Sequence, residues 1–299
     1  MKYSILNDKF FSRLETLAFN LKQNLAGYFG GKHLVSTYGQ TVEFADFREY
    51  QLGDDIRRID WNLFSRFEKY FIKLFTDERQ MHVQIFIDCS ASMGKDNPEK
   101  AAYAIASAAA LGFLAVHNMD KVSFHLLHGN VSKNPFGTIV GKTAFFRAIG
   151  QLEEAVFDGE TDLEKAITSC PDTGTNNGLS VVISDLMTDY DWKKAVDYLC
   201  YKKRQVILVQ PLTPSEIEPT FDGRVNLIDS ESIDIADSKN VKMRITRSAQ
   251  SAYNEALRDF FEDIRTFASK RGVDYVSIST DIPIEKVLFG ELLKVGMIS

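Results

Sequence analysis

The sequence predicts an α/β protein in which a doubly wound, mostly parallel sheet is flanked by helices. Two short runs, His82–Asp88 and Leu179–Ser184, are mostly apolar and rich in β-branched residues, as expected of strands buried on both faces of a parallel sheet. Each run ends in small polar residues, and segments with helical spacing of apolar residues separate the strands. An N-terminal helix and a strand-and-loop extension precede this core.

Composition and charge fit one large globular domain with an extension, or two small domains. The chain has 299 residues, 44% of them hydrophobic, and a net charge of −6, which argues against nucleic acid or an anionic membrane as the main partner. No apolar stretch is long enough for a membrane span and no signal-peptide core is visible, so we expect a cytoplasmic protein without membrane insertion. The three cysteines lack metal-binding spacing and are expected to be reduced thiols.

We expect residues 1–80 to form a helix and an extension, and residues 81–299 to form the core domain. Apolar residues recur at helical spacing from Asp8 to Gly27, and glycines mark the end of this helix. Its polar face carries few cations, so we expect it to dock on its own domain and not on a membrane surface.

The segment from residue 40 to residue 80 is irregular and rich in charges. Alternation over residues 70–74 indicates a strand. Cations and anions balance here, which favours a web of hydrogen bonds and ion pairs that braces the segment. We therefore expect Arg57, Asp60 and Trp61 to be structural and not catalytic, with partners that are buried.

The core alternates between strands and helices, as βα units should. The expected strands are His82–Asp88, Lys121–Leu127, a short hairpin within Val131–Val140, Leu179–Ser184, Gln205–Gln210 ended by Pro211, edge strands Val225–Ile228 and Val241–Ile245, and Val273–Ser279. The expected helices are Pro98–His117, Lys142–Leu152, Thr161–Thr168, Asp191–Lys202, Ser248–Lys270 and Pro283–Leu293. The first of these helices is rich in alanine, which indicates close packing against the sheet.

Polar side chains follow the two buried strands. Asp88, Ser90 and Ser92 come after the first strand, Asp185 follows the second, and Thr161 precedes a helix. Because open α/β sheets place their sites at the carboxyl ends of the strands, we expect these five side chains to converge. Their oxygens are hard ligands suited to Mg²⁺, or to Mn²⁺ or Ca²⁺. The alternative is that the aspartate and serines only cap helices.

The order of these residues carries a resemblance. Asp88-x-Ser90-x-Ser92, followed by Thr161 and Asp185, resembles the metal-ion-dependent adhesion site of von Willebrand factor type A (vWA) domains. The resemblance implies a vWA-like (Rossmann-like) fold and a divalent ion held by these residues, with one coordination position left open for an Asp or Glu of a partner protein. It therefore implies a non-enzymatic, metal-dependent protein-binding module.

A second stretch, ahead of the core, carries a family resemblance. The residues are Phe44, Arg48, Tyr50, Gly53, Asp54, Asp55, Arg57, Ile59, Asp60 and Trp61. They resemble the signature of a bacterial family catalogued as domain of unknown function 58, in which this segment lies just before a vWA core. That family is often encoded beside MoxR-type AAA+ ATPases. The resemblance implies such an ATPase, or its client, as a partner in the assembly or remodelling of protein complexes.

Two other functions stay open on the sequence. The first is a Mg²⁺-dependent phosphoryl-transfer or hydrolase enzyme that uses a strand-end aspartate. Haloacid-dehalogenase-type phosphatases need a second carboxylate two residues after that aspartate, and the chain has Ser90 there. No phosphate-binding Gly-Lys-Ser/Thr loop and no Gly-x-Ser-x-Gly motif occurs. The second is a scaffold whose site holds no metal.

Overall fold

The computed structural model describes residues 6–24, 42–51, 54–77, 80–95, 97–171, 178–218, 224–227, 241–244, 247–287 and 290. The chain divides into two compact units. The larger unit contains residues 1–23 and 81–299, and the smaller unit contains residues 24–80. The N-terminal helix, which we had grouped with the extension, thus belongs to the larger unit.

A six-stranded sheet forms the centre of the larger unit. Its strands, in spatial order, are β10 (Asp274–Ser279), β7 (Gln205–Leu212), β6 (Leu179–Ile183), β3 (His82–Asp88), β4 (Lys121–His128) and β5 (Val131–Lys133). All neighbouring pairs are parallel except β4 and β5. Counted from β3 as the first strand, the order read from β5 is 3-2-1-4-5-6, which is that of a doubly wound sheet. The predicted fold class is confirmed.

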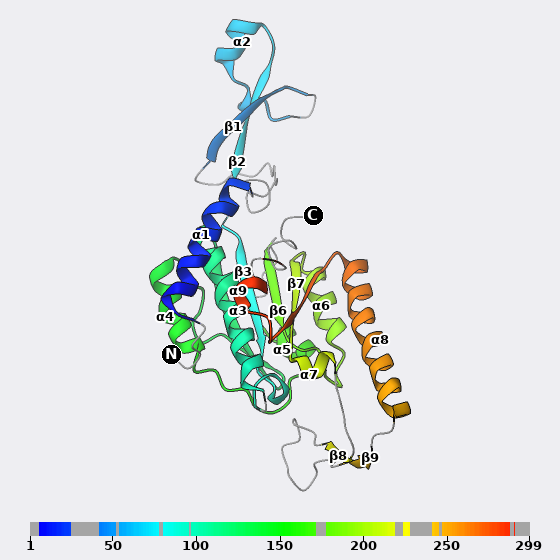
Figure 1. Ribbon diagram of the computed structural model, residues 1–299. Helices are drawn as coiled ribbons and strands as arrows, with labels where there is room; N and C mark the ends of the chain where they lie inside the picture. The colour runs from blue at the N-terminus through cyan, green and yellow to red at the C-terminus, as the bar shows by residue number, and fades with distance from the viewer. Residues whose placement is uncertain are drawn as a thin grey trace. The chain divides into compact units, whose positions relative to one another are not determined.

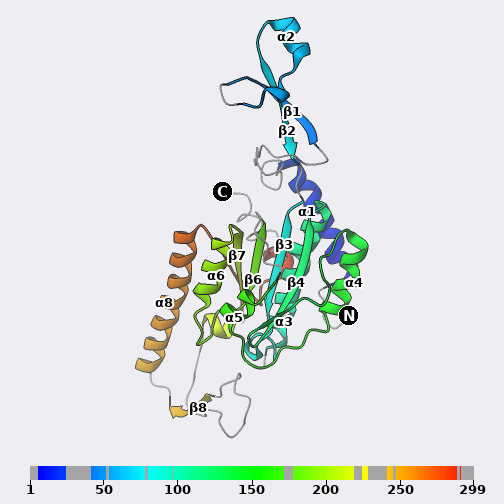
Figure 2. The same ribbon diagram turned by 180° about the vertical axis from the view of Figure 1, so that it is seen from behind.

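Helices cover both faces of this sheet (Figures 1 and 2). The first face packs against α1 (Asp8–Asn24), α3 (Pro98–His117), α4 (Lys142–Leu152) and α9 (Ile284–Val287), and the second against α5 (Leu163–Thr168), α6 (Trp192–Tyr201) and α8 (Arg247–Arg271). Side chains alternate along β3, so Ile85 and Ile87 pack in the hydrophobic core on the first face of the sheet, and Phe86 packs in the core on the second face. Both faces of the sheet are therefore buried, as the apolar strands predict.

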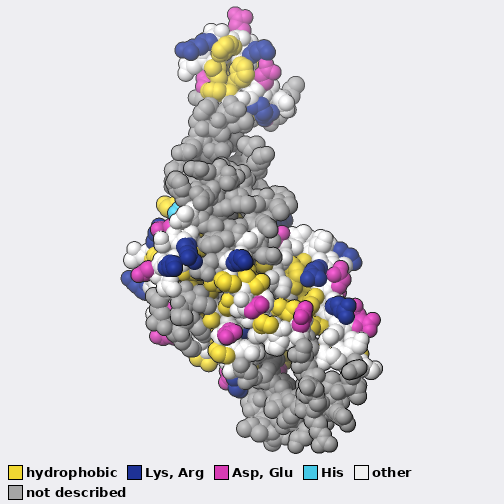
Figure 3. Space-filling model, in the orientation of Figure 1, with side chains coloured by type: hydrophobic (Ala, Val, Ile, Leu, Met, Phe, Trp, Pro, Cys, Tyr) yellow, Lys and Arg dark blue, Asp and Glu magenta, His cyan; other side chains and the backbone are white. Residues whose placement is uncertain are grey.

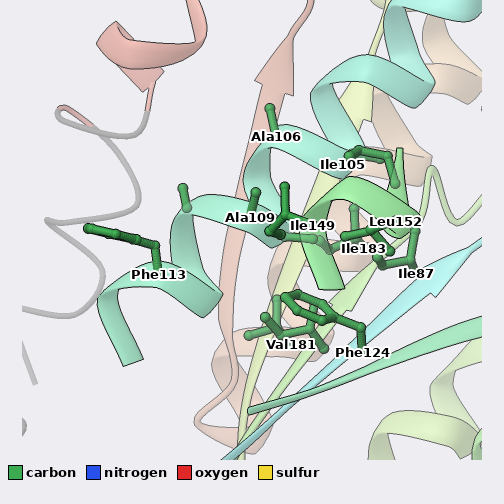
Figure 4. Close-up of a cluster of buried hydrophobic side chains, with 14 of the residues drawn as sticks. Ile87, Ile105, Ala106, Ala109, Phe113, Phe124, Ile149, Leu152, Val181 and Ile183 are labelled. Carbon is green, nitrogen blue, oxygen red and sulfur yellow. The ribbon is translucent and has the colours of Figure 1, made fainter. Parts of the chain in front are cut away.

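The alanine-rich helix α3 lies close against the sheet (Figure 4). Its residue Gly112 faces the ring of Phe124 on β4 so closely that an added Cβ would lie 2.8 Å from the ring atom Cζ. Among the described residues, α3 is the one helix long and apolar enough to cross a membrane, but 89% of its apolar window is buried inside the protein. Its apolar character is accounted for by the core.

The helix α1 docks on the larger unit, as predicted. Its buried side chains include Phe11, whose ring lies 5.6 Å from that of Phe113 in α3 and 6.3 Å from that of Phe145 in α4. The Lys142 ammonium also pairs with the Glu15 carboxylate at 2.7 Å. Apolar burial therefore fixes the position of α1, while the exposed ion pair adds little.

The structure corrects several predicted strands. The strand β7 does not end before Pro211 but continues to Leu212. The missing N–H of Pro211 costs little there, because the pairing of β6 with β7 ends at Val209. The segments β8 (Arg224–Leu227) and β9 (Val241–Arg244) pair with each other in a separate antiparallel sheet and are not edges of the main one.

Two further segments differ from the expected elements. Within Val131–Val140, only the strand β5 forms, and it pairs antiparallel with β4, while Ile139 makes an isolated bridge to Val122. Of the expected helix Pro283–Leu293, the structure describes α9 over Ile284–Val287, and most of the remainder lies outside the described residues.

The smaller unit is an antiparallel pair, β1 (Val42–Glu49) and β2 (Phe71–Asp77), with the short helix α2 (Trp61–Phe67) between them. Asp60 is buried and caps α2, because its carboxylate accepts hydrogen bonds from the backbone N–H groups of Asn62 and Leu63 at 2.8 and 3.2 Å. An ion pair of 2.8 Å joins Arg48 and Asp54. The predicted structural role thus fits Asp60.

Arg57 and Trp61 differ from Asp60, because both are exposed. Trp61 keeps 61% of its surface accessible, Ile56 63% and Phe67 61%, and Figure 3 shows hydrophobic side chains bordered by charged ones on the smaller unit. Our expectation of buried partners for these two residues is therefore wrong. Gly53, which belongs to the same predicted turn, lies outside the described residues.

Replacement of Asp60 by alanine is expected to destabilise α2 by about 1 kcal/mol, because two backbone N–H groups lose their acceptor. Hydrogen exchange of the amides in α2 measures this loss within the smaller unit. Trp61→Ala, at an exposed position of the same helix, is the matched control and should change the exchange free energy of the α2 amides by less than about 0.5 kcal/mol. Equal losses in both variants would contradict the capping role.

Candidate functional site

The expected site residues lie at the carboxyl edge of the main sheet. Asp88 is the last residue of β3, and Asp185 lies two residues beyond the end of β6. The chain runs from β3 to β4 and β5 on one side and continues through β6 on the other, so the strand order reverses between β3 and β6. Doubly wound sheets bind their ligands at this switch point.

Asp88 and Ser90, which are buried, and Ser92, which is half-buried, form a polar cluster. The Ser184 hydroxyl donates to Oδ2 of Asp88 at 2.7 Å, and the Ser90 backbone N–H donates to Oδ1 at 3.0 Å. The hydroxyl oxygens of Ser90 and Ser92 lie 3.1 Å apart. A short 3-10 helix, Ala91–Met93, begins directly after Ser90 and turns Ser92 back toward it.

Thr161 is brought to the same region through β4. Its backbone bridges to Gly129, just beyond the end of β4. The Thr161 hydroxyl donates to the Leu127 carbonyl at 3.4 Å, and the same carbonyl accepts the N–H of Cys89, the residue after Asp88, at 3.1 Å. Asp162 caps α5 and thereby fixes Thr161 at the start of that helix.

Asp185 has a partner that the sequence analysis missed. The ammonium of Lys100, in the first turn of α3, donates to Oδ2 of Asp185 at 2.8 Å and to Oε1 of Glu216 at 2.5 Å. Glu216 belongs to the short helix α7 (Pro214–Ile217). The other oxygen of the Asp185 carboxylate accepts the N–H of Met187 at 3.1 Å. Nothing in the sequence pattern signals that Lys100, Glu216 and Ser184 meet here, because these contacts join distant parts of the chain.

The electrostatics of the site reflect burial of like charges. Burial, and next the neighbouring Asp185 carboxylate, raise the pKa of Asp88 from 3.8 to about 6, against the hydrogen bonds from Ser184 and Ser90. Burial alone would lower the pKa of Lys100, but the carboxylates of Asp185 and Glu216 outweigh it and raise that pKa. The charged form of the Asp88 carboxylate is therefore held in the site at a free-energy cost that a neighbouring positive charge would reduce.

Replacement of Asp88 by asparagine is expected to change how stability depends on pH in EDTA. In the wild type the folded state binds more protons than the unfolded state between about pH 4 and pH 6, so ionisation of Asp88 lowers stability as the pH rises through that window. The variant lacks this effect. The unfolding free energy of the variant minus that of the wild type should therefore rise by about 2–3 kcal/mol across the window and stay constant above it. Urea unfolding at each pH measures it, and a flat difference would contradict the raised pKa.

The chemistry of the donor set fits a hard divalent cation. Asp88, Ser90, Ser92 and Thr161 offer oxygen atoms near the switch point, and Asp185 offers a carboxylate shared with Lys100. No three His, Cys, Asp or Glu side chains gather as a metal-ligating group anywhere in the described part of the chain. Hydroxyl groups would therefore have to supply part of the coordination, which suits Mg²⁺ and disfavours zinc.

The fold and the position of these residues define a doubly wound α/β protein with an acidic, hydroxyl-rich site at its switch point. Residues 46–259, more than half of the chain, match the family model described as protein of unknown function DUF58. The chain belongs to this family, and the resemblance predicted from the segment Phe44–Trp61 is confirmed.

Similar proteins include uncharacterized proteins of Mycobacterium tuberculosis and Mycobacterium bovis. Each is 28% identical over 238 residues, which span 78% of this chain and 74% of the relative. Among solved structures, an aerotolerance-related membrane protein from Bacteroides fragilis is 15% identical, with a TM-score of 0.40, over 72% of this chain and 99% of that one. A von Willebrand factor type A protein from Catenulispora acidiphila is 13% identical, with a TM-score of 0.33, over 48% and 35%. These likenesses are distant, and the fold assignment rests on the strand order.

Proposed function

We propose that the chain is a non-enzymatic protein-binding module whose contact with its partner depends on a divalent cation, Mg²⁺ or else Mn²⁺ or Ca²⁺. Asp88, Ser90, Ser92, Thr161 and Asp185 would hold the cation. Bound there, the cation would supply a positive centre to which an Asp or Glu carboxylate of the partner protein can bind.

One observation carries this proposal. Two buried carboxylates and three hydroxyls, from the loops after β3 and β6 and from the start of α5, lie at the edge where a doubly wound sheet binds its ligands. Helix capping does not account for Asp88, because its carboxylate accepts from the Ser184 hydroxyl of a different strand end. The negative charges of Asp88 and Asp185 repel each other, and a cation bound between them would reduce this repulsion.

The residues around Asp88 support binding rather than hydrolysis. A phosphatase of the haloacid-dehalogenase type would need a carboxylate where this chain has Ser90, and the Ser90 hydroxyl instead lies 3.1 Å from that of Ser92. Neither group is a general acid or base near neutral pH. We infer that the site binds and does not turn over a substrate.

The partner that the family resemblance supports is a MoxR-type AAA+ ATPase or its client. The test is capture of a purified MoxR-type ATPase by the chain in MgCl₂ and again in EDTA, beside calorimetric titration of the chain with MgCl₂. The proposal expects ion binding, and capture only with the ion present. Capture of equal strength in EDTA would support a metal-free scaffold, and steady hydrolysis of phosphoesters with MgCl₂ would support the enzyme.

A further inference from the structure

We propose that Lys100 is a built-in counter-ion that competes with the divalent cation for Asp185. This competition lowers the affinity of the site for the cation, so that the cation binds reversibly. This inference rests on the proposed function and adds a residue that regulates the same site. It concerns the affinity for the ion and not the partner.

The surroundings of Lys100 support this role. A lysine side chain with none of its surface exposed is rare unless it is paired, and Lys100 is paired twice, with Asp185 at 2.8 Å and with Glu216 at 2.5 Å. Its ammonium therefore offsets the charge of Asp185 when no ion is bound. The ammonium also repels a second cation at short range in a buried site, where charges interact strongly.

Lys100 also lies close in the hydrogen-bond network to the main expected ligand. Asp185 directly follows Ser184, whose hydroxyl donates to Oδ2 of Asp88. The Lys100 pair with Asp185 is thus separated from Asp88 by one backbone step and one hydrogen bond. A charge change at Lys100 must therefore alter the free energy of a cation beside Asp88.

Glu216 explains how Lys100 can release Asp185. One carboxylate oxygen of Glu216 accepts from the ammonium, and the other accepts the N–H of Thr213 at 2.7 Å and its hydroxyl at 3.0 Å. This capping box holds Glu216 in place independently of the lysine. If an ion binds the Asp185 carboxylate, the buried Lys100 ammonium therefore keeps Glu216 as an anionic partner in a fixed position. Lysine and ion can then exchange without an unpaired buried charge.

The experiment is calorimetric titration of the full chain with MgCl₂, and with MnCl₂ where the affinity is low. Lys100→Met removes the charge and keeps the length of the side chain, and is expected to tighten ion binding on the order of tenfold or more. Lys95→Met is the matched control, because Lys95 is half-exposed and pairs with Asp158 and not with Asp185. It should change the affinity less than about twofold, because exposed charges are screened.

Glu216→Gln is expected to change the ion affinity in the opposite direction to Lys100→Met. With its second anion neutralised, Lys100 depends more on Asp185, so ion binding should weaken several-fold. In the double variant Lys100→Met/Glu216→Gln this weakening should disappear, because the lysine that transmits it is absent. If Lys100→Met is folded but too unstable for calorimetric titration, its melting temperature is compared with and without MgCl₂, and the ion should raise it more than it raises that of the wild type.

The outcomes separate this inference from the proposed function. If the wild type binds the ion and Lys100→Met binds it equally or more weakly, the competition is overturned and the metal site survives. An equal loss from Glu216→Gln with and without Lys100 also overturns it. If neither the wild type nor Lys100→Met binds divalent ions, both the proposed function and this inference are overturned.

Discussion

Asp88→Asn is expected to lower the affinity for divalent ions on the order of a hundredfold or more and to abolish ion-dependent capture of the partner. Loss of groups that only support a metal ligand typically costs ten- to a hundredfold in affinity, so loss of an ionised ligand should cost at least as much. The fold should remain, because asparagine can accept from the Ser90 N–H with its oxygen and donate to the Ser184 hydroxyl with its amide group, and because it removes the repulsion with Asp185. Calorimetry, circular dichroism and capture on the same protein measure all three effects.

The control for this variant is Asp162→Asn. Asp162 is a buried carboxylate beside Thr161, but it caps α5 by accepting the N–H of Lys165 at 3.1 Å, and asparagine caps helices equally well. Ion affinity should change less than about threefold. If Asp88→Asn captured the partner at wild-type strength without binding an ion, the adhesion-site mechanism would be refuted.

Phe124→Ala is expected to lower the free energy of unfolding by about 3–5 kcal/mol. The ring of Phe124 is fully buried between β4 and α3, with its centroid 6.3 Å from those of Phe136 and Phe145. Gly112 lets α3 approach this ring closely, since an added Cβ would lie 2.8 Å from its Cζ atom, so removal of the ring leaves a gap directly beside the helix. The loss therefore contains a cavity cost in addition to the lost burial.

Urea unfolding followed by circular dichroism measures the effect of Phe124→Ala. Tyr201→Ala serves as its control, because 81% of the Tyr201 surface is exposed, and it should change the unfolding free energy by less than about 0.5 kcal/mol. A loss below about 1 kcal/mol for Phe124→Ala would show that the packing of α3 on β4 is not the one described.

The sequence could predict those parts of the fold in which local pattern and burial agree. The runs that became β3 and β6 are buried on both faces, so their composition alone distinguishes them from the amphipathic helices around them. Pro211 misled the prediction of β7, because a proline is tolerated in a strand once the neighbouring strand has ended, and that depends on the length of β6. The mutual pairing of β8 and β9 likewise depends on partners that no local pattern names.

In the site, too, local sequence pattern predicts some residues, while others depend on contacts between distant parts of the chain. Asp88, Ser90, Ser92 and Asp185 could be placed at one edge because each follows a recognisable strand. Lys100 could not be placed there. A lysine in the first turn of a helix normally faces water, and its burial follows from carboxylates that lie 85 and 116 residues away in sequence. The exposure of Trp61 was missed for the converse reason, since a large apolar residue is expected inside.

The central position of β3 has a consequence for synthesis of the chain on the ribosome. One edge of β3 can pair with β4 soon after β4 emerges. The other edge has no partner until β6 is synthesised, because Val83 pairs there with Leu179. For the translation of nearly a hundred residues, the edge of this mostly apolar strand has no native partner and can pair with other nascent chains. Nascent-chain folding should therefore depend on chaperones until β6 has left the exit tunnel.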